Sequence, residues 1–237
     1  MIVISILTYD RLEVAKRCIL SVSKYLKASE EFWLHLADDG SSQDYRDELA
    51  ELARSLYGNS VSMSNSQRSG YGGNYNASTQ ITHQVSDLML PLEDDWEMQR
   101  ELNLDPIAAV LRDGIFGCVR LAYIGATQEL RAKFVLTHGY HWLALDPDSP
   151  ERHVWAGGPR IETVEWEKAV GPWPEHMEQG YTEHIVAAYP AARYGIAWPV
   201  GLIYPQGDVF AHIGGEKASI NGIDTSKQGI PKIKDGQ

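Results

Sequence analysis

The N-terminal part of the chain alternates strand-like and helix-like segments, and this alternation constrains the fold more than any other feature. Ile2–Thr8 is a β-branched run of strand length, and apolar residues follow it at helical spacing over residues 12–26, with Asp10 placed to cap the start of that helix. Strands joined by helices form right-handed crossovers and a mainly parallel sheet. We therefore predict an α/β fold that binds ligands at the carboxyl edge of its sheet. The order recurs, with strands expected at residues 32–37, 61–64 and 88–92 and helices at 45–56 and 74–85.

The second half of the chain has a different character. A helix is expected at residues 105–112, where Pro106 suits a first helical position. A last helix should open at Thr182 and run toward residues 194–195, with Pro190 as a kink or an end. Between these helices, strands are expected at residues 115–124, 133–136, 140–145, 153–156 and 160–166. The polar residues 214–237 form a tail that is either a mobile lid or disordered.

Composition limits the class of protein. Hydrophobic residues make up 43% and charged residues 22% of the 237 residues, as in globular domains. No apolar stretch is long enough to span a bilayer, and the N-terminus lacks the features of a signal peptide. Because Cys18 and Cys118 both lie in apolar patterns, we expect a soluble cytoplasmic protein with reduced thiols. The formal net charge of -11 argues against a broad nucleic-acid surface, which needs clustered Lys and Arg.

Three consecutive carboxylates, Glu93, Asp94 and Asp95, follow the apolar run at residues 88–92. Hard oxygen ligands at the end of a buried strand can hold Mg²⁺ or Mn²⁺ and leave positions open for substrate phosphates. The alternative is a solvated turn, because acids crowd strand ends without any catalytic role. On their own the three acids do not decide between a metal site and a turn.

Asp38 and Asp39 follow the second predicted strand in the segment Asp-Asp-Gly-Ser-Ser, which is expected to be a turn. A short acid here can accept hydrogen bonds from a nucleobase or a ribose, or it can cap the next helix. Its position at the carboxyl edge favours ligand binding. Residues 65–73 are expected to form a loop, and the glycines after Arg68, including Gly72, can let the backbone approach a nucleotide. This loop is not the dinucleotide fingerprint, and the chain lacks a Walker-type loop.

Two further residues are candidates for chemistry. His212 lies far from the acids in sequence, and one of eight histidines is more often structural than a ligand. A chain that returns to the carboxyl edge could nevertheless bring this imidazole to a cation held by Asp95. Glu183 follows Thr182 at a predicted helix start, where it either complements the helix dipole or serves as a general base. For Trp142, Trp155, Trp166 and Trp173, core packing is favoured over stacking on a sugar.

Placed in order, these segments resemble the inverting nucleotide-sugar glycosyltransferases of family 2, which have the GT-A fold. In the first half the resemblance rests on Thr8-Tyr9-Asp10-Arg11, Asp38-Asp39-Gly40-Ser41-Ser42, residues 65–77, and Glu93-Asp94-Asp95 in place of the family's Asp-x-Asp. In the second half it rests on the order of residues 171–175, Thr182-Glu183, residues 193–195 and His212. The resemblance implies one GT-A domain over residues 1–213, with a nucleotide-sugar half at 1–114 and an acceptor half at 115–213.

The resemblance also implies roles for individual residues. Thr8 and Asp39 would bind the base and ribose, with Tyr9, Asp10 and Asp38 beside them and Arg68 and Gly72 near the nucleotide. Asp95 and His212 would hold Mn²⁺ or Mg²⁺ at the diphosphate, with Glu93 and Asp94 supporting ribose or metal. Glu183 would be the base that takes the proton of an acceptor hydroxyl. The donor expected from the resemblance is a sugar linked to uridine diphosphate.

Two positions depart from the family pattern. Glu93 replaces the first Asp of the metal motif, so Asp95 is the safer ligand. The helix reads Thr-Glu-His where the family often has Glu-Asp, so His184 is the alternative base. This departure also leaves open a catalytically inactive sugar-nucleotide-binding or assembly module on the same fold. The acceptor stays open among glycan, lipid-linked sugar, protein side chain and modified nucleobase.

Overall fold

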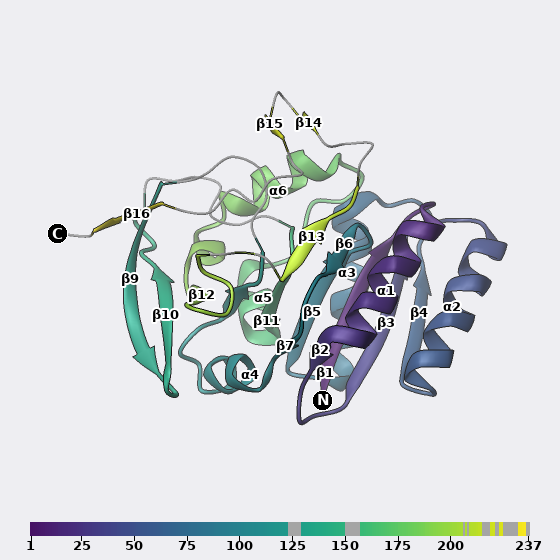
Figure 1. The fold of residues 1–237 in the computed structure, drawn as a ribbon. Helices are drawn as coiled ribbons and strands as arrows, with labels where there is room; N and C mark the ends of the chain where they lie inside the picture. Colours follow the sequence, from purple (N-terminus) through teal and green to yellow (C-terminus); the bar gives the residue numbers. More distant parts are fainter. Residues whose placement is uncertain are drawn as a thin grey trace.

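The computed structural model describes residues 1–122, 129–149, 157–205, 207, 209–214, 219–220, 223–224 and 232–235. Its centre is a ten-stranded sheet in the order β16-β9-β10-β12-β8-β11-β5-β1-β3-β4 (Figure 1). The helices are α1 (Leu12–Tyr25), α2 (Gln43–Tyr57), α3 (Gly70–Val85), α4 (Asp105–Arg112), α5 (Val164–Val170), α6 (Gln179–Ala187) and the 3-10 helix η1 (Pro190–Arg193). The strands are β1 (Ile2–Thr8), β2 (Leu26–Lys27), β3 (Phe32–Asp38), β4 (Val61–Asn65), β5 (Leu88–Glu93), β6 (Trp96–Met98), β7 (Leu102–Asn103), β8 (Cys118–Arg120), β9 (Glu129–Thr137), β10 (Tyr140–Leu145), β11 (Arg160–Thr163), β12 (Ile196–Pro199), β13 (Phe210–His212), β14 (Ser219–Ile220), β15 (Ile223–Asp224) and β16 (Lys232–Asp235).

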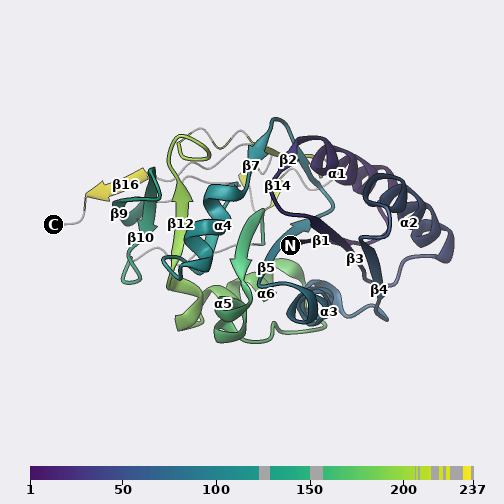
Figure 2. The ribbon, with the colours of Figure 1, turned by 90° about the horizontal axis from the view of Figure 1, so that it is seen from below.

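The first half of the chain forms the parallel part of the sheet, as the alternation predicted. β5, β1, β3 and β4 are all parallel neighbours, with Leu7 opposite Glu93 and Thr8 opposite Asp38. Helices α1 and α2 cover one face of these strands, and α3 covers the other together with α5 and α6 (Figure 2). The carboxyl ends of β1, β3 and β5 therefore meet at one edge, where the loops that follow them carry the acids.

The second half extends the same sheet with mixed pairing. β11 runs antiparallel between β5 and β8, β12 is parallel to β8, and the β9–β10 hairpin continues the sheet from β12. In Figure 1 this hairpin lies at the opposite end of the sheet from α2. The division of the chain into halves at residues 114 and 115 stays a prediction, since one sheet runs through both.

The core forms where apolar faces of helices meet the buried strands. All seven residues of β1 are buried, and helix α1 turns Ala15, Cys18, Ile19 and Val22 toward the sheet at the spacing of one helix face. Burying an isoleucine or valine side chain contributes about 1.5 to 3 kcal/mol. Among the described residues, no helix is both long enough and apolar enough to cross a membrane.

Several local predictions were wrong. Asp10 does not cap the first helix: it has a φ of 48°, and α1 begins after Arg11 without a side-chain cap. Helix α3 begins at Gly70, inside the predicted loop, because packing overrides the low helix propensity of glycine. A Cβ at Gly72 would collide with the carbonyl oxygen of Pro174, so the helix approaches that backbone only with a glycine here.

Two strand predictions in the second half were too long. Within residues 115–122 the strand covers only Cys118–Arg120, and residues 123–124 lie outside the described part. The strand predicted at 160–166 ends at Thr163, whose hydroxyl accepts a hydrogen bond from Trp166 N at 3.0 Å and caps α5. The strand predicted at 153–156, Trp155, and most of the tail at 214–237 also lie outside the described residues.

Candidate active site

The loop after β3 is held together by the two acids that were expected to bind a nucleotide. Oδ2 of Asp38 accepts hydrogen bonds from the N–H groups of Gly40 and Ser41 at 3.1 and 2.8 Å. Its Oδ1 accepts from the hydroxyls of Ser41 at 2.6 Å and Thr8 at 3.3 Å. Asp38 and Thr8 are both buried. The geometry therefore gives these two residues a structural role in shaping the edge of the site.

Asp39 connects the same loop to helix α3. Its Oδ1 accepts hydrogen bonds from Ser69 N at 2.7 Å and from the hydroxyls of Ser66 and Ser69 at 3.2 Å each. Its Oδ2 accepts from Gly70 N at 3.1 Å. A carboxylate at a helix N-terminus binds unpaired N–H groups and complements the helix dipole. Asp39 thus anchors the start of α3, which the sequence did not predict.

An exposed aromatic ring and a guanidinium lie in contact beside this loop. The Arg68 guanidinium carbon lies 3.6 Å from the centroid of the Tyr9 ring, and Tyr9 is 37% exposed. Arg68 and Tyr9 were both expected near the nucleotide, and the fold brings them together. The amide of Asp10, next to Tyr9, donates to the hydroxyl of Ser41 at 3.0 Å, while the Asp10 residue is exposed.

The three consecutive acids Glu93, Asp94 and Asp95 form an acid triad. Its last two members face Arg11, just before helix α1. Arg11 Nη1 lies 2.8 Å from Oδ2 of Asp95, and Arg11 Nη2 contacts Oδ1 of Asp94. Partial burial of Arg11 lowers its pKa, but the two carboxylates outweigh that effect and raise the pKa above its ordinary value. Arg11 was quoted in the sequence motif without a role. Its position just after β1, at the carboxyl edge of the sheet, is a signal that could have pointed to the acids.

Asp95 also lies in contact with His212, the other residue that was expected to hold a cation. Nε2 of His212 lies 3.3 Å from Oδ2 of Asp95, and Ile213 N donates to the Asp95 carbonyl at 2.8 Å. The contact arises because β13 pairs with β6 and places His212 opposite Trp96. In Figure 1 β13 lies alongside β6, across the carboxyl edge of β5. Burial raises the pKa of Asp95, but His212 and Arg11 outweigh it and hold that pKa below its ordinary value.

The residues at this position fit a divalent cation only in part. In the described part of the chain no three His, Cys, Asp or Glu side chains lie close enough together to hold a metal ion. Asp95 and His212 could supply two ligands. Among the described residues, Oδ1 of Asp95 is buried and has no hydrogen-bond partner, so its lone pairs remain available. Mg²⁺ and similar ions are often held by one or two protein ligands together with substrate phosphates and water.

Glu93 belongs to a different cluster from its two neighbours. Its Oε2 accepts a hydrogen bond from Gln179 Nε2 at 2.7 Å, on helix α6. Burial raises the pKa of Glu93 well above its ordinary value, and the nearby carboxylates of Asp95 and Glu183 raise it further. The fold therefore separates the triad, with Glu93 facing α6 and the other two acids facing α1.

Glu183 lies in the same cluster as Glu93. Its Oε1 accepts a hydrogen bond from Gly157 N at 2.7 Å, and protein atoms enclose its carboxyl group although part of the residue is exposed. Burial raises the pKa of Glu183, while the Gly157 N–H and Gln179 act in the opposite direction. The neighbouring His184 is exposed. Gln179 stands four residues before Glu183 on one helix face, a spacing that the sequence analysis missed.

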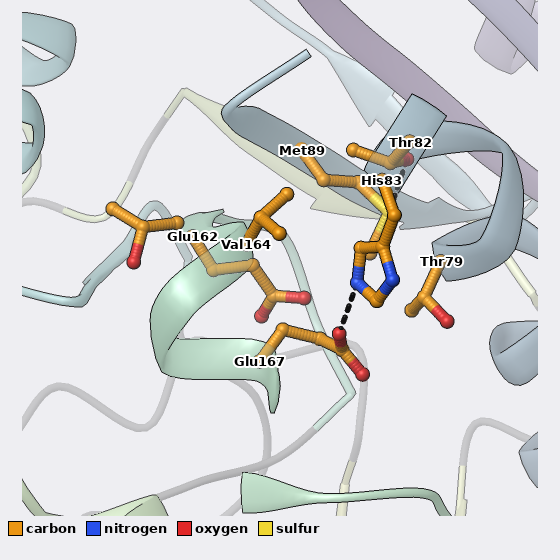
Figure 3. Close-up of a pocket in the computed structure, with 8 residues that line it drawn as sticks. Thr79, Thr82, His83, Met89, Glu162, Val164 and Glu167 are labelled. Carbon is orange, nitrogen blue, oxygen red and sulfur yellow. Dashed lines mark hydrogen bonds and ion pairs between the residues drawn. The ribbon is translucent and has the colours of Figure 1, made fainter. Parts of the chain in front are cut away.

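A pocket elsewhere in the fold contains none of the predicted site residues. It lies near the amino end of β5. His83 and Glu167 are among the residues that line it, and Nε2 of His83 lies 2.6 Å from Oε2 of Glu167 (Figure 3). Burial raises the pKa of Glu167 to about 7. Because it lies at the opposite end of β5 from the acid triad, this pocket is not part of the candidate active site.

Comparison with known proteins gives a family match and structural likenesses. The sequence model of Glycosyl transferase family 2 matches residues 3–156. No curated protein sequence matches the chain significantly. Many solved structures are similar in fold.

Three of these structures illustrate the likeness. TarS of S. aureus is 15% identical with a TM-score of 0.62, over 83% of this chain and 34% of TarS; its residues 1–349 have also been solved with UDP-GlcNAc. GalNAc-T7 with UDP, GalNAc and Mn²⁺ is 14% identical with a TM-score of 0.60, over 84% of this chain and 42% of that chain. The mannosyltransferase PcManGT of Pyrobaculum calidifontis, with GDP-Man and Mn²⁺, is 13% identical with a TM-score of 0.51, over 87% of this chain and 58% of that chain.

At these identities the likeness concerns the fold. It confirms the predicted α/β architecture of the GT-A type, with a mostly parallel central sheet. The present chain spans between 34% and 58% of the length of these three structures.

Proposed function

The chain belongs to glycosyl transferase family 2, and on that premise we propose that it transfers a sugar from a nucleotide diphosphate donor to an acceptor hydroxyl. The proposed donor is a UDP-sugar, the proposed cofactor is Mn²⁺ or Mg²⁺, and the reaction inverts the anomeric centre. The separation of the acid triad supports this proposal most directly. Asp95 with His212 and Glu183 with Glu93 form two carboxylate clusters with different surroundings, as a metal-diphosphate site beside a base requires.

Each cluster has a chemistry that suits its role. A cation bound at Asp95 and His212 would neutralise the charge that develops on the leaving diphosphate. Glu183 would accept the proton of the acceptor hydroxyl, because an enclosed carboxylate with a raised pKa is a stronger base than an exposed one. The inward position of Glu183 and the exposure of His184 favour Glu183 as the base. Tyr9 and Arg68 would contact the nucleotide, while Thr8, Asp38 and Asp39 would shape its site.

The acceptor is proposed only as a class. Glycans, lipid-linked sugars, protein side chains and modified nucleobases each present a hydroxyl. Incubation of the protein with UDP- and GDP-sugars, Mn²⁺ and a panel of these acceptors, followed by mass spectrometry of the products, would identify both substrates.

Two substitutions test the division of roles. Asp95→Asn should abolish Mn²⁺-dependent binding of UDP, measured by calorimetry. Glu183→Gln should lower kcat by at least about a hundredfold and leave donor affinity nearly unchanged. Glu178→Gln, at an exposed glutamate just before α6, is the matched control and should behave like the parent protein. Unchanged transfer in Glu183→Gln would refute the base, and donor binding without turnover of any acceptor would favour the inactive binding module.

A further inference from the structure

A buried ion pair lies behind Glu183. Arg160 and Glu162, two residues apart on β11, are both 0% exposed, and Nε of Arg160 lies 2.7 Å from Oε2 of Glu162. The hydroxyl of Tyr75 donates to the other carboxylate oxygen of Glu162. Removing two charges from water costs several kcal/mol per ion, so such a pair seldom stabilises a fold more than apolar residues would. A role beyond stability would account for its presence.

The ion pair is connected to Glu183 through one glycine. Nη1 of Arg160 donates to the Gly157 carbonyl at 3.0 Å, and the Gly157 N–H donates to Oε1 of Glu183 at 2.7 Å. A Cβ at Gly157 would lie 2.6 Å from Oε1 of Glu183 and 2.8 Å from Oε1 of Glu93, and it would collide with the Tyr71 hydroxyl. The absence of a side chain at this position is therefore what allows the contact with Glu183.

Aromatic rings hold the guanidinium of Arg160 in place. It lies 5.3 Å from the ring centroids of Tyr75 and Trp173, and these two rings stack on each other at 3.7 Å. The side chain of Asn76 binds the backbone N–H of Trp173 at 2.9 Å and its carbonyl at 3.0 Å. Arg160 is thus fixed by β11, α3 and the segment before α6.

We propose that Arg160 is a positioning residue for Glu183 and acts on it through Gly157. The inference rests on the proposed role of Glu183 as the base. A base must keep its carboxylate aimed at the acceptor. Arg160, held by its ion pair and two aromatic rings, binds the carbonyl of the same glycine whose N–H binds this carboxylate.

The charges around Glu183 agree with this role. Glu93 faces it from β5, Arg120 from β8, Arg160 from β11 and Tyr71 from α3, with Gln179 and His184 on its own helix. Burial raises the pKa of Glu183, and Arg120 and Arg160 are among the groups that oppose this rise. Arg160 therefore also favours the ionised form that a base needs.

The test reads the carboxyl group directly and needs no donor. Protein labelled with ¹³C at the glutamate side-chain carboxyls would be titrated by NMR, with the Glu183 signal assigned through Glu183→Gln. In Arg160→Met the pKa of Glu183 should rise by about one unit or more, and the Gly157 amide should exchange with solvent faster. The matched control is Glu162→Gln, which breaks the same ion pair but keeps the arginine. It should leave the pKa of Glu183 unchanged or lower it.

Each outcome decides the inference. An unchanged pKa and unchanged Gly157 exchange in Arg160→Met would overturn it, as would a rise of equal size in Glu162→Gln. Should Arg160→Met fail to fold, Arg160→Lys decides, because lysine keeps the charge but lacks the planar fork. Faster Gly157 exchange in Arg160→Lys supports the inference, and unchanged exchange refutes it. If Arg160→Met shows the expected changes in the Glu183 pKa and in Gly157 exchange while Glu183→Gln keeps full activity, the proposed base is refuted and the positioning by Arg160 stands.

Discussion

Asp95 and His212 meet through one oxygen, with Nε2 of His212 3.3 Å from Oδ2 of Asp95. The guanidinium of Arg11 approaches the same oxygen to 2.8 Å. A cation bound to His212 and to Oδ2 of Asp95 would therefore compete with Arg11 for that oxygen. This competition links the affinity of the site for metal to a residue that is not itself a ligand.

Removal of the Arg11 guanidinium should strengthen metal binding. Arg11→Gln frees Oδ2 of Asp95 from a charge-assisted hydrogen bond, so the Kd for Mn²⁺ should fall by about tenfold. Isothermal titration calorimetry with MnCl₂ measures this without donor. Arg17→Gln is the control, since Arg17 lies on α1, which directly follows Arg11, but pairs with Glu97. Equal affinities in Arg11→Gln and the parent protein would contradict the competition.

Asp39 should act mainly through the stability of the fold. Asp39→Ala removes the acceptor of four hydrogen bonds to Ser66, Ser69 and Gly70. The free energy of unfolding should fall by about 2 to 4 kcal/mol in urea denaturation, because N–H groups at the start of α3 lose their partner. Asp44→Ala, at an exposed acid in the first turn of α2, should cost less than about 1 kcal/mol. A loss no larger than that of the control would mean that the Asp39 carboxylate is free to serve a ligand.

Gly157 should tolerate no side chain. Gly157→Ala places a Cβ among the oxygens of Tyr71, Glu93 and Glu183, so the free energy of unfolding should fall by about 1 to 3 kcal/mol. Gly180→Ala, on α6, meets no atom within 4 Å and should be neutral or stabilise by up to about 1 kcal/mol. Chemical denaturation of both variants provides the comparison. Similar stabilities would show that the contacts around Gly157 adjust without cost.

His35 should make the fold sensitive to acid. It is fully buried on β3 between the hydroxyls of Ser62 and Ser64, and burial lowers its pKa to about 4. Because the unfolded chain has the higher pKa, it binds the proton first, and stability is lost as the pH falls from about 6.5 toward 4. The loss attributable to His35 between pH 7 and pH 5 is about 2 kcal/mol.

The free energy of unfolding at pH 7 and pH 5 measures this effect. In His35→Gln the change of stability from pH 7 to pH 5 should differ from that of the parent protein by about 2 kcal/mol in the stabilising direction, whereas His141→Gln, at an exposed histidine, should change like the parent. An equal change of stability between the two pH values in His35→Gln and the parent protein would show that His35 is not buried in its neutral form.

Local patterns predicted the first half of the fold well. The strand at Ile2–Thr8 and the helix at Asp105–Arg112 agree with the sequence analysis, because one has β-branched composition and the other has a proline at its start and a periodic apolar face. Helix α3 was predicted too late, because its first turn is held by Asp39 and by close backbone packing at Gly72. Neither contact has a signature in the local sequence.

The sequence by itself determined the alternation of strands and helices and placed the acids at the carboxyl edge, since both follow from residue periodicity and chain order. Tertiary structure alone decided which acid faces which partner. Pairing of β13 with β6 brought His212 to Asp95, while packing of α6 near the end of β5 brought Gln179 and Glu183 to Glu93. These contacts join residues far apart in the chain, and their geometry depends on strand register and helix packing, which no local pattern specifies.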